Sequence, residues 1–180
     1  MSLRYAILTG LNERPATGLE LARRFDRSIG YFWPASHQQI YRDLDRLESD
    51  GWISEVERHG PQQQGQPRRF SITDAGREAL TAWVQQVDEP ASTRDALMVR
   101  VRAAASLGPA QVRETVAHHL AAHERLLLTY REIEARDFAG GEPTPATALL
   151  HLVLRRGIET EELWVRWCRE VLDLVDRPGS

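Results

Sequence analysis

The sequence predicts a mainly α-helical protein with one small β-hairpin. Helical periodicity runs through most of the 180 residues, one stretch between residues 52 and 72 alternates apolar and polar side chains, and capping residues, Pro or Gly separate the segments. Pro90 ends one of these helices, and every segment after it is helical. We therefore expect two domains, residues 1–90 with the hairpin and residues 91–180 built from helices alone.

Composition indicates a globular protein. Hydrophobic residues make up 42% of the chain and charged residues 27%. No apolar run approaches the roughly 20 residues that a membrane span needs, and the N-terminus lacks a secretory-signal pattern. The single cysteine, Cys168, excludes an intramolecular disulfide, so we expect a cytoplasmic protein without membrane association. With a net charge of −3, binding to nucleic acid would need positive charge concentrated locally.

Two short helices are expected first. Apolar residues at helical spacing indicate the first one, namely Leu3, Ala6, Ile7 and Leu11. Residues 12–16, which include Pro15, predict a turn. Thr17 is placed to cap a second helix over residues 18–30. The apolar residues of this helix fit one buried stripe: Leu19, Leu21, Ala22, Phe25 and Ile29.

The third helix carries the strongest local signals. Pro34 disfavours helical backbone at the residue before it, and Ser36 with Gln39 forms the S-x-x-Q pattern of a capping box. The apolar residues that follow share one face: Ile40, Leu44 and Leu47. Gly51 is placed to end the helix. The exposed first turn then presents side chains that hydrogen-bond base edges or phosphates.

Two strands and a fourth helix follow. Residues 52–57 and 68–72 alternate as strands do, and the polar residues 59–67 between them predict a loop. Thr73 is placed to cap a helix over residues 74–89, in which we expect four side chains to pack: Ala75, Leu80, Trp83 and Val87.

Three short helices followed by a hairpin form the outline of a winged helix-turn-helix. We expect the third helix and the basic hairpin to bind double-stranded DNA through these residues: Ser36, His37, Gln38, Gln39, Tyr41, Arg42, Arg58, Arg68 and Arg69. His59 adds to the basic wing. The alternative is a winged helix that binds only proteins, which is favoured by acidic residues toward the C-terminal end of the third helix: Asp43, Asp45, Glu48 and Asp50.

The second domain is expected to hold three helices. Ser92 and Asp95 predict a capped helix that ends at Gly108. A long helix over residues 109–138 has a coiled-coil-type seam of Val112, Val116, His119, His123, Leu126, Tyr130 and Ile133. The last helix follows a hinge at residues 137–144, with Leu149, Leu152, Val153, Leu163, Trp164, Trp167, Val171 and Leu174 on its apolar side. Such long amphipathic helices favour packing in a homodimer.

Several residues of the second domain could also form a metal site or a small-molecule site. His119 and His123 share a helix face at the spacing that Zn²⁺ sites use, with His118 beside them, but the sequence offers no clear further ligand, so we predict no metal and no cofactor. Aromatic and histidine side chains form a candidate effector site: His119, His123, Tyr130, Trp164 and Trp167. Cys168 is interpreted as a structural residue. No phosphate-binding loop or nucleophile–base pair is present, so we expect no enzymatic activity.

The chain resembles the PadR family of bacterial transcriptional regulators. The segments that carry this resemblance are SLRYAILTGL, GLELARRF, FWPASHQQIYRDLDRLESDGWI and PRRFSITDAGREAL. The second half is similar in character to the subgroup with a longer helical dimerisation region. The start of that family's DNA-reading helix is matched in this chain by Ser36, His37, Gln38, Gln39 and Tyr41. Arg68 and Arg69 match the basic wing, although Phe70 stands where Tyr is common.

The resemblance implies a dimeric repressor that binds a palindromic operator and is released by a small molecule. We expect that effector to be hydrophobic or aromatic. The family's effector sites vary, so neither the effector nor the operator and its genes follow from the sequence.

Overall fold

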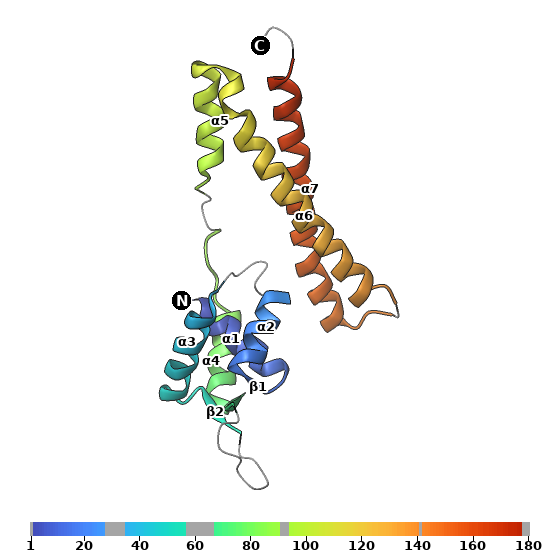
Figure 1. Ribbon diagram of the computed structural model, residues 1–180. Helices are drawn as coiled ribbons and strands as arrows, with labels where there is room; N and C mark the ends of the chain where they lie inside the picture. The colour runs from blue at the N-terminus through green and yellow to red at the C-terminus, as the bar shows by residue number, and fades with distance from the viewer. Residues whose placement is uncertain (1, 28–34, 57–66, 91–93, 141, 178–180) are drawn as a thin grey trace. The chain divides into compact units, whose positions relative to one another are not determined.

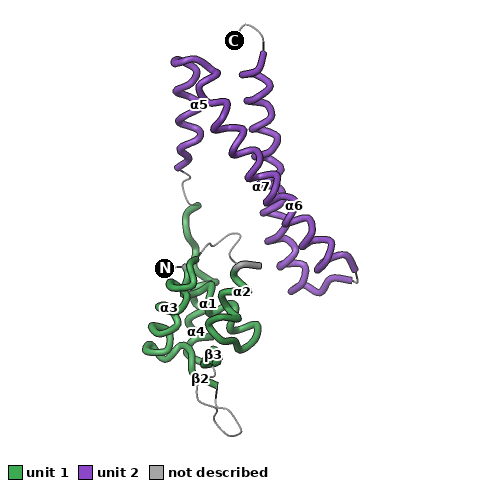
Figure 2. The backbone as a smooth tube through the Cα atoms, in the orientation of Figure 1, with its two compact units in different colours: residues 1–90 green, residues 91–180 purple. Residues whose placement is uncertain are grey.

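The computed structural model describes residues 2–27, 35–56, 67–90, 94–140 and 142–177. The chain divides into two compact units, residues 1–90 and 91–180 (Figure 2). Within the described ranges, no helix is both long enough and apolar enough to cross a membrane.

In its described residues, the first unit joins four helices to a three-stranded sheet (Figure 1). Its elements are α1 (Ser2–Glu13), β1 (Ala16–Thr17), α2 (Gly18–Arg27), α3 (His37–Ser49), β2 (Ile53–Glu55), β3 (Arg69–Ile72) and α4 (Asp74–Val84). One apolar core holds them together, with Ile7, Leu8, Leu11, Leu21, Phe25, Ile40, Leu44, Leu47, Ile53, Phe70 and Ile72 buried in it. The predicted stripes of α1 and α3 therefore do face the core, because burying them removes apolar surface from water.

The sheet has a strand that the sequence did not predict. Its order is β1–β3–β2, and all pairs are antiparallel. Thr17 of β1 lies opposite Arg69 of β3, so residue 16, expected in a turn, pairs with the wing strand instead. The hairpin tip, with Arg58 and His59, lies outside the described residues.

Helix α4 begins where the sequence predicts but ends earlier. Thr73 caps it as predicted, accepting a hydrogen bond from the backbone N–H of Gly76. The helix ends at Val84 rather than at residue 89, and the Val87 side chain is fully exposed. Ala75 is also exposed, whereas Trp83 stacks on Tyr5 of α1 with ring centroids 4.6 Å apart. In α2, Leu19 is exposed, and Ile29 lies outside the described residues.

The second unit consists of helices α5 (Ala96–Leu107), η2 (Pro109–Val112), α6 (Arg113–Asp137) and α7 (Pro145–Val175). Gly108, with a φ of +118°, ends α5. Asp95 caps α5, accepting from the backbone N–H of Leu97, while Ser92 lies outside the described residues. The helix expected over residues 109–138 begins with a 3₁₀ turn and then becomes α6.

Helices α6 and α7 run side by side in opposite directions (Figure 1). Most of the apolar seam predicted on α6 faces α7 or the neighbouring helices within the same chain, with Val112, Val116 and Tyr130 buried. The predicted apolar side of α7 is buried only in part within the single chain, where Trp164, Trp167 and Val171 pack against the core of this unit. The buried residues of α7 are Ile158, Glu161, Val165 and Cys168, whereas Leu149, Leu152, Val153, Leu163 and Leu174 are exposed.

Candidate nucleic-acid interface

The first turn of α3 is fixed by the capping box that the sequence predicts. The Ser36 hydroxyl accepts from the Gln39 backbone N–H at 3.3 Å, and the Gln39 side-chain oxygen accepts from the Ser36 backbone N–H at 2.8 Å. These bonds satisfy two backbone donors that a helix start otherwise leaves unpaired. At the other end, Gly51 adopts a φ of +73°, a conformation that glycine tolerates best.

This start of α3 is polar and exposed. Ile40, Leu44 and Leu47 are buried against the core, which fixes the opposite side of the helix toward solvent. The predicted DNA-binding residues of α3 are all exposed: Ser36, His37, Gln38, Gln39, Tyr41 and Arg42. The structure therefore brings six of the nine predicted residues together on one surface.

Tyr41 is positioned by a glycine of the neighbouring helix. Its ring lies against Gly18, the first residue of α2, so closely that a Cβ at residue 18 would overlap the ring. Even so, 47% of Tyr41 remains exposed. The close approach therefore holds the ring on α2 while leaving much of it open to solvent.

Arg68 is bonded within the unit. Its Nε donates to a carboxylate oxygen of Glu55 at 2.6 Å, and its Nη2 donates to Glu48 of α3. The guanidinium also lies over the Phe70 ring, 4.9 Å from the ring centroid. The hydrogen bonds to Glu55 and Glu48 raise the pKa of Arg68. Arg68 therefore links the hairpin to the C-terminal part of α3.

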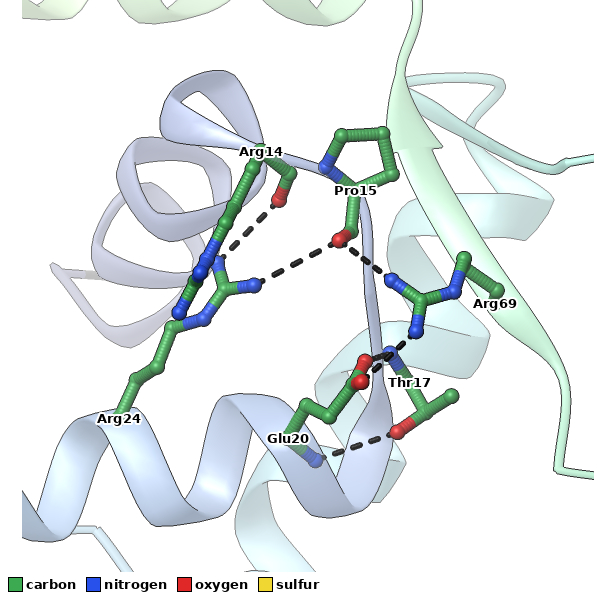
Figure 3. A network of polar contacts seen from close by, with 6 residues as sticks. All are labelled: Arg14, Pro15, Thr17, Glu20, Arg24 and Arg69. Atoms are coloured by element: carbon green, nitrogen blue, oxygen red, sulfur yellow. Dashed lines mark hydrogen bonds and ion pairs between the residues drawn. The ribbon is translucent and has the colours of Figure 1, made fainter.

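Arg69 is bonded to the segment before α2 (Figure 3). Its Nη1 donates to the Pro15 carbonyl oxygen at 2.9 Å, and its Nη2 donates to Glu20 at 2.7 Å. The other oxygen of Glu20 accepts from the Thr17 backbone N–H at 2.8 Å, and that bond is the main reason why the pKa of Glu20 is lowered. The Thr17 hydroxyl in turn accepts from the Glu20 N–H, completing a capping box at α2.

A second arginine approaches the same segment. Arg24 donates to the carbonyl oxygens of Gly10 at 2.9 Å, Arg14 at 3.2 Å and Pro15 at 3.5 Å. Burial lowers the pKa of Arg24. The Pro15 carbonyl thus lies between two guanidinium groups, as Figure 3 shows.

Arginines pair with most of the acidic residues at the end of α3. Asp43 pairs with Arg46, Glu48 with Arg68, and Asp50 with Arg4. These pairs reduce the local negative charge that would otherwise repel a polyanion.

In the second unit, four of the five predicted effector residues form one cluster between α6 and α7. His123 lies with Nδ1 2.5 Å from a carboxylate oxygen of Glu161 and stacks on Trp164 with centroids 5.0 Å apart. Trp167 lies edge-on to Trp164, and the His119 ring stacks beside His123.

Tyr130 is separate from this cluster. It is buried two helical turns further along α6, where its ring lies against Gly157 of α7. Within the portion of the chain that the structure describes, no three His, Cys, Asp or Glu residues are arranged to hold a metal ion.

The sequence did not predict a role for three residues of these sites, namely Gly18, Glu20 and Glu161. Gly18 and Glu20 sit in a stretch that the sequence explains as an ordinary helix start, although the T-x-x-E spacing of Thr17 and Glu20 is itself a capping-box signal. Glu161 is not among the site residues expected from the sequence, but only 7% of it is exposed. Its partner lies on another helix, so no local pattern reveals it.

Known proteins are similar to this chain over both units. Residues 7–82 match the Transcriptional regulator PadR-like family, and residues 93–176 match the Virulence activator alpha C-term family. A "probable transcriptional regulator" of Mycobacterium tuberculosis is 40% identical, with 97% of this chain and 98% of that protein covered.

Two solved structures extend the comparison. The Vibrio cholerae virulence activator AphA has a TM-score of 0.79 and 34% identity, covering 97% of this chain and 98% of AphA. Bacillus subtilis PadR in complex with operator DNA has a TM-score of 0.80 and 25% identity, covering 98% of this chain and all of PadR. PadR has also been solved with p-coumaric acid.

These likenesses confirm the winged-helix architecture and the resemblance drawn from the sequence, including the longer helical second half. They also confirm the expectation that the protein is not an enzyme, since the relatives are transcriptional regulators. The chain belongs to the PadR-like family of transcriptional regulators.

Proposed function

We propose that this regulator binds a specific operator by placing the start of α3, hereafter the recognition helix, in the major groove. The observation that carries the proposal is the capped first turn of α3, which presents an exposed polar surface from residue 36 to residue 42. His37, Gln38 and Arg42 offer donors and acceptors to base edges and phosphates, and Tyr41 offers a phenol at a fixed position. The operator-bound structure of the similar Bacillus subtilis PadR supports this mode.

The protein acts as a homodimer in this proposal. Six large apolar side chains of α7 remain exposed in the single chain: Leu149, Leu150, Leu152, Val153, Leu163 and Leu174. A helix with apolar residues on two sides is typical of one that is buried on both sides. A two-fold dimer through the second unit covers this surface and presents two recognition helices to a palindromic operator.

The regulator represses transcription and is released by a small hydrophobic or aromatic effector. The aromatic cluster of His119, His123, Trp164 and Trp167 supports an aromatic effector, because flat rings stack on such side chains. The p-coumaric acid complex of PadR supports the same class of ligand. An effector bound at this cluster releases DNA only if it binds the DNA-free arrangement more tightly.

Fluorescence anisotropy tests the proposed function. Purified protein is titrated onto its own upstream intergenic duplex and onto a scrambled duplex of equal length, over a series of salt concentrations. Tight, salt-dependent binding that prefers the upstream duplex is expected. Equal weak binding to both duplexes would instead favour a winged helix that binds proteins.

A further inference from the structure

Arg69 is bonded as a structural link, although its position on the wing strand suggests a contact to a DNA phosphate. Its two terminal nitrogens are used by the Pro15 carbonyl and by Glu20. These bonds use two of the five N–H donors of the guanidinium and hold the group in one orientation, toward residues 15–20. The Arg69 side chain is 40% exposed, so water weakens its ion pair with Glu20. The two hydrogen bonds still fix the orientation of the guanidinium.

The contacts of Arg69 join the wing strand to residues 15–20, a segment 49 to 54 residues earlier in the sequence. Its own strand, β3, is part of the wing, and Thr17, its cross-strand neighbour, caps α2. Glu20 belongs to the first turn of α2 and completes that cap. Pro15 precedes β1, and its carbonyl also accepts from Arg24. Arg69 therefore fixes β3 against the start of α2.

The start of α2 in turn touches the recognition helix. Gly18, next to Thr17, lies against the ring of Tyr41. A shift of the α2 start relative to β3 therefore displaces either the wing or the Tyr41 ring.

We propose that Arg69 is a positioning residue for DNA binding, which holds the wing strand and the start of α2 in one fixed arrangement through Glu20 and the Pro15 carbonyl. This inference rests on the proposed function, since it explains how the recognition helix and wing keep their relative placement. Glu20 works with Arg69, although its negative charge would by itself oppose binding to DNA.

The salt dependence of binding distinguishes positioning from phosphate contact. The logarithm of the binding constant falls as the logarithm of the salt concentration rises. Each phosphate contact that is lost reduces the steepness of this fall, the salt slope, by about 0.9 per bound protomer. Arg69→Gln is expected to weaken operator binding about three- to fivefold, the scale of an exposed ion pair, with an unchanged slope. Arg42→Gln, on the exposed face of the recognition helix, is the matched comparison and should lower the slope.

Conservative variants sharpen the distinction. Arg69→Lys keeps the charge but cannot donate to two acceptors in the fork geometry of arginine, so it should bind no better than Arg69→Gln. Glu20→Gln should weaken binding, although it removes a negative charge. Glu78→Gln, an exposed residue of α4, controls for net charge and should leave binding unchanged. The Glu20→Gln and Arg69→Gln effects should not add in the double variant.

Amide hydrogen exchange supplies a readout without DNA. In Arg69→Gln, residues 16, 17, 69 and 70 should exchange faster than in the wild type, while residues 40–47 of the recognition helix should not change. This pattern, with an unchanged salt slope and no rescue by Arg69→Lys, supports the proposal.

Three results would overturn it. They are a slope lowered by about 0.9, tighter binding by Glu20→Gln, or wild-type affinity in Arg69→Gln. Wild-type protein without preference for its upstream duplex would refute the proposed function and, with it, any role of Arg69 in DNA binding. Amide hydrogen exchange would then show separately whether Arg69 holds β1 and β3 together.

Discussion

Tyr41 of the recognition helix lies directly against Gly18 of α2, and this contact leaves no room for a side chain at residue 18. Two other glycines lie in different surroundings and allow comparison. Gly76 faces the Trp52 backbone carbonyl, and Gly140 faces open space.

The first prediction concerns Gly18→Ala. The new Cβ should push the Tyr41 ring aside, and since this ring is half exposed it can move at little cost in stability. We expect about fivefold weaker operator binding, the scale of one lost hydrogen bond, with a nearly unchanged unfolding transition. Anisotropy and urea denaturation check both parts. Gly140→Ala is the control, and equal binding by the two variants would show that the orientation of Tyr41 does not matter.

The second prediction is that Gly76→Ala destabilises the first unit. A Cβ at residue 76 would overlap the Trp52 carbonyl oxygen, which is backbone and cannot rotate away. We expect a loss of roughly 1–3 kcal/mol in the free energy of unfolding, as for other overpacked sites. Urea denaturation followed by tryptophan fluorescence measures it. A stability equal to that of the wild type would mean that α4 can shift away from the β2 end without cost.

The third prediction concerns His123 and Glu161. Glu161 is only 7% exposed and has His123 as its close partner across the helix pair. His123→Leu leaves that carboxylate buried without the imidazole and should cost roughly 3 kcal/mol of stability. Replacing both residues by Leu should recover most of this loss, because the uncompensated carboxylate is gone. A double variant as unstable as the single one would contradict the assignment.

The fourth prediction uses Cys168. Its side chain is buried in the core of the second unit, and burial raises the pKa of its thiol. Because the thiolate is the reactive form, the folded protein should react with a thiol reagent far more slowly than the protein in urea. The labelling rate then reports the opening of α7. Rapid labelling in native buffer would show that α7 separates readily from α5 and α6.

The sequence predicts best what depends on neighbouring residues. Ser36 and Gln39 are three residues apart, so their capping box follows from local geometry, and the structure confirms it. The same holds for Thr73 and for the glycine that ends α3. The buried face of α3 follows from its periodicity, since a helix with one apolar side must turn that side inward.

Long-range pairing was not predictable in the same way. Strand β1 has two residues, too few to show any alternation, and it exists because β3 pairs with it. The partners of Arg68 and Arg69 lie on other elements, so the basic wing pattern alone could not reveal that both arginines are bonded within the unit. On α7, apolar residues occur on two sides, and periodicity could not tell which side faces α6.

The preference of Gln38 variants for the operator tests the central claim most directly. Gln38 is exposed on the recognition helix and is expected to bond a base edge. The measurement is the ratio of affinities for the upstream and the scrambled duplex at one salt concentration, for the wild type and for Gln38→Ala. We predict that the ratio falls about tenfold, while affinity for the scrambled duplex is retained. An unchanged ratio, or an equal loss on both duplexes, would contradict the assignment of α3 as the sequence-reading element.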